Sequence, residues 1–85
     1  MATRNPKIRK YGIFFKEHID GLVMSRVLNQ HNFYYVMDTV HGMGEYDGWT
    51  LLMVHATKKS FDDIISRELE GRKFEGRVFN VHVLG

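Results

Sequence analysis

The pattern of apolar and polar positions along the chain predicts four strands and two helices. Residues 8–16, Ile-Arg-Lys-Tyr-Gly-Ile-Phe-Phe-Lys, are rich in strand-forming side chains, so we expect a first strand there. Residues 33–40 form a second β-branched and aromatic run, and residues 49–56 form a third. In residues 78–84 apolar and polar side chains alternate, which predicts a last strand with one buried face.

Helical spacing occurs in two stretches between these strands. In residues 20–30 apolar side chains recur at intervals typical of a helix, and Asp20 is placed to cap its start. The second stretch has a stripe at i, i+3, i+4 and i+8, formed by Phe61, Ile64, Ile65 and Leu69. Ser60 and Asp63 match a capping box before this stripe, and Gly71 suits the left-handed backbone that ends many helices.

Glycines mark the connections. The run Gly42-Met-Gly-Glu-Tyr-Asp-Gly48 is typical of a hairpin loop between the second and third strands, and Glu75-Gly76 predicts a turn before the last strand. The resulting order predicts an α+β, ferredoxin-like βαββαβ domain, a four-stranded antiparallel sheet with two helices on one face. Because two helices with one apolar stripe each cover a single face, the other face meets solvent or a partner.

Length and composition indicate one domain. The chain has 85 residues, of which 44% are hydrophobic, and we expect a basic tail at residues 1–7 followed by a domain at 8–85. The first sixteen residues carry five basic and no acidic side chains: Arg4, Lys7, Arg9, Lys10 and Lys16. Such an arm either contacts phosphates or is an ordinary solvated tail, and both interpretations stay open.

Strand alternation indicates which side chains lie on the face without helices. In the third strand Trp49 and Leu51 share this face, opposite a compact aliphatic set suited to packing under helices. In the first strand we expect Phe14 and Lys16 on it, which leaves the other apolar side chains for the core. Two side chains of the last strand are expected there as well, Asn80 and His82.

The second strand is compatible with either orientation, and Asp38 favours the one that points Tyr34 outward. Flat aromatic side chains on an open sheet stack unpaired bases, at ~1–3 kcal/mol for each base. The alternative is that the apolar face is covered by a tail, a partner protein or a second copy of the chain.

The C-terminal half resembles the RNA recognition motif. Asp47-Gly-Trp-Thr-Leu-Leu-Met-Val54 is similar in register to the longer signature of that family, and Leu69–Val81 resembles its run from the second helix into the last strand. Ile13-Phe14-Phe15 stands in place of the shorter signature. The resemblance covers roughly residues 11–84 and implies that single-stranded RNA lies on the sheet.

The resemblance also implies roles for three side chains: Phe14 and Trp49 at base-stacking positions and Leu51 at the third. The chain departs from the family pattern, since Asp47 replaces a basic residue, Leu51 replaces an aromatic one, and no Gly-Asn-Leu follows the first strand. Members with such departures often bind protein.

We therefore expect a non-catalytic module that binds single-stranded RNA, with Arg9, Lys10 and Lys16 on phosphates. The alternative is a small protein-binding adaptor or inhibitor, of phage or regulatory type, whose same apolar face binds a protein partner or pairs as a homodimer. Five histidines without a helix-spaced pair, and no cysteine, indicate no metal or cofactor, and no nucleophile with a partnered base indicates no enzyme. The absence of an apolar span or secretory signal predicts no membrane contact and an intracellular location, cytoplasmic or nuclear.

Overall fold

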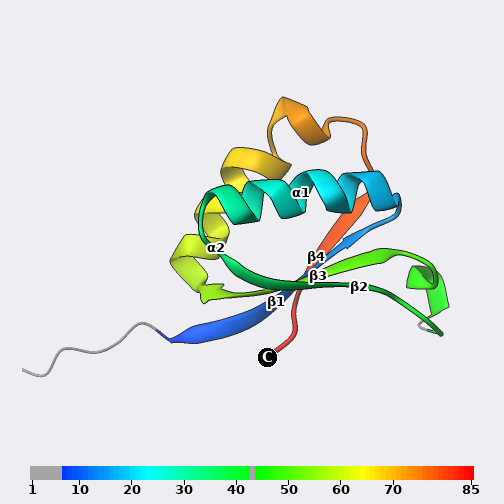
Figure 1. Cartoon of the computed structure of the whole chain (residues 1–85), viewed down its shortest axis with the longest axis horizontal. Helices are drawn as coiled ribbons and strands as arrows, with labels where there is room; N and C mark the ends of the chain where they lie inside the picture. Colours follow the sequence, from blue (N-terminus) through cyan, green and yellow to red (C-terminus); the bar gives the residue numbers. More distant parts are fainter. Residues whose placement is uncertain (1–6, 43) are drawn as a thin grey trace, which may run out of the picture.

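The computed structural model describes residues 7–42 and 44–85. The α+β class and the four-stranded antiparallel sheet with two helices are confirmed (Figure 1). The main elements, in chain order, are β1 (Ile8–Phe15), α1 (His18–Gln30), β2 (Tyr34–Thr39), β3 (Thr50–Thr57), α2 (Lys58–Ile64) and β4 (Phe79–Val83). Three short helical segments complete the described chain: η1 (Gly44–Tyr46), the π-helical η2 (Ile65–Leu69) and η3 (Arg72–Phe74).

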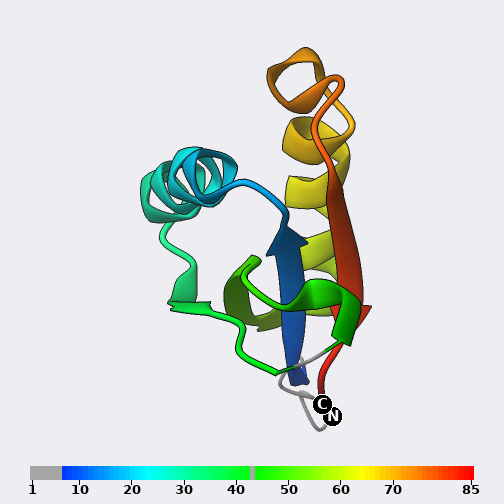
Figure 2. The same cartoon turned by 90° about the vertical axis from the view of Figure 1, so that its right-hand side faces the viewer.

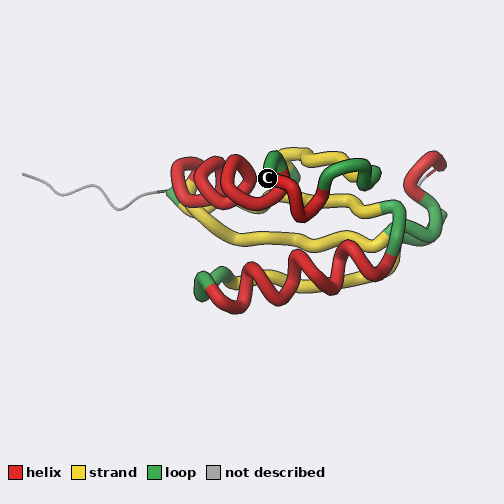
Figure 3. Tube along the Cα trace, turned by 90° about the horizontal axis from the view of Figure 1, so that it is seen from above, coloured by secondary structure: helices red, strands yellow, loops and turns green. Residues whose placement is uncertain are grey.

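The strands lie in the order β2-β3-β1-β4, and all neighbours are antiparallel. The two central strands pair along their whole length, from Ile8 opposite Thr57 to Phe15 opposite Thr50. Both helices lie on one side of the sheet, and Figures 2 and 3 show them side by side there. The other side carries no helix, as the two apolar stripes predicted.

The core lies between the sheet and the helices. It takes three side chains from β1 and three from β3, namely Tyr11, Ile13, Phe15, Leu52, Val54 and Ala56. The helical side chains that meet them are Met24, Val27, Leu28, Phe61, Ile64, Leu69 and Phe74. The predicted orientation of both central strands is therefore correct, because period-two alternation leaves their remaining side chains for the opposite face.

The start of α1 differs from the prediction. The helix begins at His18, and Glu17 holds the N-cap position without a side-chain hydrogen bond. Asp20 lies inside the first turn and is buried, and its Oδ1 lies 3.4 Å from Nε of Arg77. Asp20 was therefore wrongly assigned as the cap; its carboxylate serves a long-range ion pair with the turn before β4.

The ends of the second helical stretch also differ. The hydroxyl of Thr57 accepts a hydrogen bond from the backbone N–H of Ser60 at 3.2 Å, so Thr57 is the cap and the predicted capping box at Ser60 is wrong. Gly71 has φ −91° and is not left-handed. It is needed for close approach, since a Cβ there would lie 2.9 Å from the carbonyl oxygen of Arg67. Gly76, in the predicted turn, does have a positive φ of 76°.

The last strand is more exposed than its pattern predicted. Phe79 packs against the core, but Val81 and Val83 stay exposed on the helix side of β4. The predicted half-buried strand is therefore wrong in its C-terminal part, because β4 is an edge strand over which neither helix packs closely.

Candidate functional site

The face without helices, here called the open face, is built from alternate residues of all four strands. Strand register and core orientation assign to it Lys10, Gly12, Phe14, Tyr34, Val36, Asp38, Leu51, Met53, His55, Asn80 and His82. The expected outward orientation of Tyr34 is confirmed, since Tyr34 pairs with His55 while the neighbouring Tyr35 pairs with the buried Val54.

Phe14 lies on the open face, yet its ring is covered. Only 3% of its surface is exposed. The ring of Tyr46 from η1 stacks on it, with 4.6 Å between ring centroids and 19° between planes, and His82 meets it edge-on at 5.5 Å. The expectation of an uncovered ring at position 14 is wrong, because the loop between β2 and β3 folds back over β1.

Tyr46 is held in place from two sides. Its hydroxyl lies 2.9 Å from Nε2 of His82, and its ring meets Trp49 edge-on at 4.9 Å. We call Phe14, Tyr46, Trp49 and His82 the aromatic cluster. Within it Trp49 is half-buried and packs on Tyr46, so it is less available for stacking than expected.

Sequence reasoning missed Tyr46 because it lies in a loop, where neither helical nor strand spacing applies. The signal in the sequence was an aromatic residue between glycines. Gly44 and Gly48 both have positive φ, 56° and 83°, so the loop takes a path that other residues adopt only at a cost. Glycine content pointed to a turn, but the direction of the turn depends on contacts with β1 and β4.

The end of the sheet beside the aromatic cluster is acidic. Glu45 and Asp47 belong to the loop that carries Tyr46, and Asp38 lies opposite Leu51 on the open face. The carboxylate of Asp47 accepts a hydrogen bond from the backbone N–H of Gly42 at 2.9 Å. Asp47 therefore helps to close the loop.

The opposite end of the open face carries a different set. Lys10, His55 and Tyr34 lie side by side on three neighbouring strands, and we call them the Tyr34 row. Tyr34 is 67% exposed, and its ring meets that of His55 edge-on at 5.1 Å. A hollow of about 320 Å³ borders the row, with Ile8 and Thr57 also in its wall.

This end of the sheet is basic. Lys7 precedes β1, and Lys58 and Lys59 directly follow β3, whose last residue pairs with Ile8. Lys58 donates a hydrogen bond to Asp62 at 2.7 Å, and this bond, with the charge of Asp62, raises the pKa of the Lys58 ammonium. Within residues 7–42 and 44–85, Lys10 and Lys59 form no ion pair.

The other predicted site residues are distributed over three places. Leu51 is half-buried opposite Phe14, and Asn80 lies exposed beside that ring on β4. Lys16 is exposed just after β1, at the cluster end. Arg9 lies on the helix side, beside Phe61 and Val83, so it does not share the open face with Lys10. Strand alternation puts consecutive residues on opposite faces. Arg4 lies outside the described residues.

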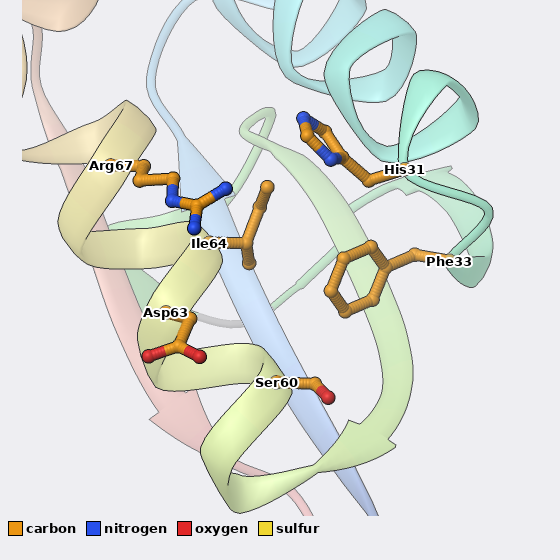
Figure 4. A pocket seen from close by; sticks show the side chains of 6 residues that line it. All are labelled: His31, Phe33, Ser60, Asp63, Ile64 and Arg67. Atoms are coloured by element: carbon orange, nitrogen blue, oxygen red, sulfur yellow. The ribbon is translucent and has the colours of Figure 1, made fainter.

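A pocket of about 230 Å³ lies between the C-terminal end of α1 and α2, and we call it the interhelical groove. Its lining residues are His31, Phe33, Ser60, Asp63, Ile64 and Arg67 (Figure 4). Figure 4 shows the carboxylate of Asp63 turned away from His31. Among the described side chains, no hydrogen bond joins Ser60, His31 and Asp63. The groove thus presents no nucleophile with a partnered base.

Among residues 7–42 and 44–85, no three His, Cys, Asp or Glu side chains gather as a metal site. No helix in this part of the chain has the length and apolarity to span a bilayer.

No model of a known protein family matches the chain, and no curated protein matches it significantly. The candidate sites are therefore judged on their geometry and charge.

Proposed function

We propose that the protein is a non-catalytic module that binds single-stranded RNA across the Tyr34 row of the open face. The observation that carries this proposal is the row itself, where an exposed phenol ring, an imidazole and an ammonium lie on three adjacent strands. An unpaired base stacks on the Tyr34 ring, and Lys10 contacts a phosphate. The βαββαβ order is that of ferredoxin-like domains. The proposal includes that this domain is a ferredoxin-like domain similar to the RNA recognition motif.

Stacking on Tyr34 is favoured over stacking on Phe14 by the cost of access. A base on Phe14 must first displace Tyr46, which loses an aromatic stack worth about 0.5–1.5 kcal/mol and its hydrogen bond with His82. Tyr34 is already exposed, so a base meets it without rearrangement. The ring at position 34 therefore takes the role that the family resemblance assigned to Phe14.

The distribution of charged side chains also favours RNA binding at the end of the sheet that carries the Tyr34 row. Phosphates are attracted by Lys7, Lys10 and Lys59 near the Tyr34 row, whereas Glu45 and Asp47 repel them at the aromatic cluster. Lys16 is an exposed cation, but it follows β1 at the same end of the sheet as these acids. We expect the strand to bind mainly at the basic end.

The test is a titration of labelled single-stranded oligoribonucleotides, followed by fluorescence anisotropy at low salt. Three variants separate the contributions of the side chain, namely Tyr34→Phe, Tyr34→Leu and Tyr34→Ala. Stacking worth ~1–3 kcal/mol predicts that Tyr34→Leu and Tyr34→Ala weaken binding about 5- to 150-fold, while Tyr34→Phe binds nearly as the parent does. Equal affinity for the Phe and Leu variants, or no binding at low salt, refutes the proposal.

A second candidate function, binding to a protein, has its own observation. The middle of the open face is apolar and carries no cation: Val36 is 43% exposed and Met53 is half-buried beside it. A contiguous apolar surface of this kind is typical of a protein contact. Pairing with a second copy is tested by light scattering, with Val36→Asp to break the contact and Val83→Asp as control on the other side of the sheet. A monomer at high concentration rules out self-association.

A further inference from the structure

The hollow beside the Tyr34 row and the interhelical groove adjoin each other. His31, Phe33 and Ser60 line both of them. The hollow opens at Tyr34 and His55 on the sheet, while the groove continues between the helices to Ile64 and Arg67, so the two form one path around the end of the sheet.

Two nitrogen-bearing side chains point into the groove from opposite walls. Figure 4 shows the guanidinium of Arg67, from η2, and the imidazole of His31, at the end of α1, directed toward the gap above Ile64. Phe33 closes the side nearer the sheet. This lining combines an apolar floor with N–H donors at the rim.

Arg67 has no acidic partner among the described residues. Asp63 lies four residues earlier and is the natural helical partner, yet Figure 4 shows its carboxylate turned away from the guanidinium. Glu68, the next residue, pairs with Lys73 at 3.6 Å. An unpaired guanidinium in a groove presents a planar fork of donors that fits the oxygens of a phosphate.

We infer that the interhelical groove binds a phosphate of the RNA strand whose base stacks on Tyr34, with Arg67 as the main donor and His31 as the second. This inference rests on the proposed function. The strand leaves the open face at the Tyr34 row, passes Phe33 and enters the groove. The RNA thus binds at the end of the sheet and between the helices, and not along the middle of the open face.

The experiment compares Arg67→Gln with Arg26→Gln, since Arg26 is exposed on α1 and lines neither pocket. Both substitutions remove one positive charge and keep a polar side chain. We expect Arg67→Gln to weaken binding of an eight-nucleotide RNA roughly threefold to tenfold and to reduce the slope of log K against log salt by about 0.7, the value for one phosphate. Arg26→Gln is expected to change neither.

Probe length separates this inference from the proposed function. A nucleoside offers a base and no phosphate, so Tyr34→Leu should weaken its binding and Arg67→Gln should not. If Tyr34→Leu weakens binding of the eight-nucleotide RNA but Arg67→Gln acts like Arg26→Gln, the groove inference is wrong and the proposed function stands. If RNA does not bind, or Tyr34→Leu has no effect, the proposed function fails.

A direct measurement follows the side chain itself. On addition of the eight-nucleotide RNA, the NMR signal of the Arg67 Nε–H group should shift, while that of Arg26 should stay. Both variants are expected to unfold at the same temperature as the parent protein, because both side chains are exposed. This control excludes a folding defect. An unmoved Arg67 signal at saturating RNA overturns the inference.

Discussion

Tyr46→Ala tests whether the aromatic cluster is part of the fold. In the parent protein Tyr46 stacks on Phe14, meets Trp49 edge-on and bonds through its hydroxyl to His82. Aromatic pairs are each worth about 0.5–1.5 kcal/mol beyond the area they bury. A net hydrogen bond adds roughly 0.5–1 kcal/mol, at the low end because this one is exposed.

The sum predicts that Tyr46→Ala lowers the free energy of unfolding by about 1.5–4 kcal/mol. For a domain of this size that corresponds to a fall of roughly 6–32 °C in Tm. Trp49 is the single tryptophan of the chain, so urea unfolding followed by its fluorescence reports directly beside the substitution. The emission of the folded variant is expected to shift to longer wavelength as the indole meets more water.

Two controls sharpen the measurement. Tyr34→Ala removes an equally large but exposed ring and should change the free energy of unfolding by less than about 0.5 kcal/mol. A double-mutant cycle of Tyr46→Phe with His82→Ala isolates the hydroxyl–imidazole contact, for which we expect a coupling of about 0.5–1 kcal/mol. If Tyr46→Ala is no more destabilising than Tyr34→Ala, the cluster contributes nothing and Phe14 returns as a stacking candidate.

Three further substitutions test packing and charge by urea or thermal unfolding. Gly21→Ala places a Cβ 2.6 Å from Cγ2 of Thr50, so we expect a loss of about 1–3 kcal/mol that Thr50→Ser partly restores; no loss would contradict the close approach. Tyr11→Phe removes a buried hydroxyl that has no partner among the described residues, and should raise stability by about 1 kcal/mol, whereas a fall would reveal a bond to that oxygen. Asp62 raises the pKa of Lys58 above 10.5, so the stabilisation from the Lys58–Asp62 pair is present at lower pH and is lost as the pH rises through the pKa of Lys58 in the folded protein. The difference in Tm between Lys58→Met and the parent should therefore be constant from neutral to mildly alkaline pH. A change of this difference within that range would contradict the assignment.

The elements and their order were predictable because each was encoded in local spacing. The i, i+3, i+4, i+8 stripe from Phe61 to Leu69 marked the second helical stretch, although its last part is a π-helix. Cap positions were less predictable, since Thr57 and Ser60 both suit a helix start and the backbone geometry selects between them.

For the two central strands, sequence alone determined which side chains face the helices and which do not. In β1 and β3 the compact set around Ile13 and Val54 was distinguishable from the aromatic and polar set, because a strand alternates strictly between its two faces. Alternation left two orientations open for the second strand, and Asp38 favoured the one that points Tyr34 outward, whereas Lys10 was expected on phosphates because it belongs to the basic N-terminal run.

Only the tertiary structure decided which residues of the open face remain accessible. Tyr46 covers Phe14 from a loop thirty-two residues away in the chain, and contacts over such separations leave no periodic trace in the sequence. For the same reason only the folded structure shows that Val83 is exposed, since no helix packs over it. Only the folded structure also shows that His31 and Arg67 line the same groove.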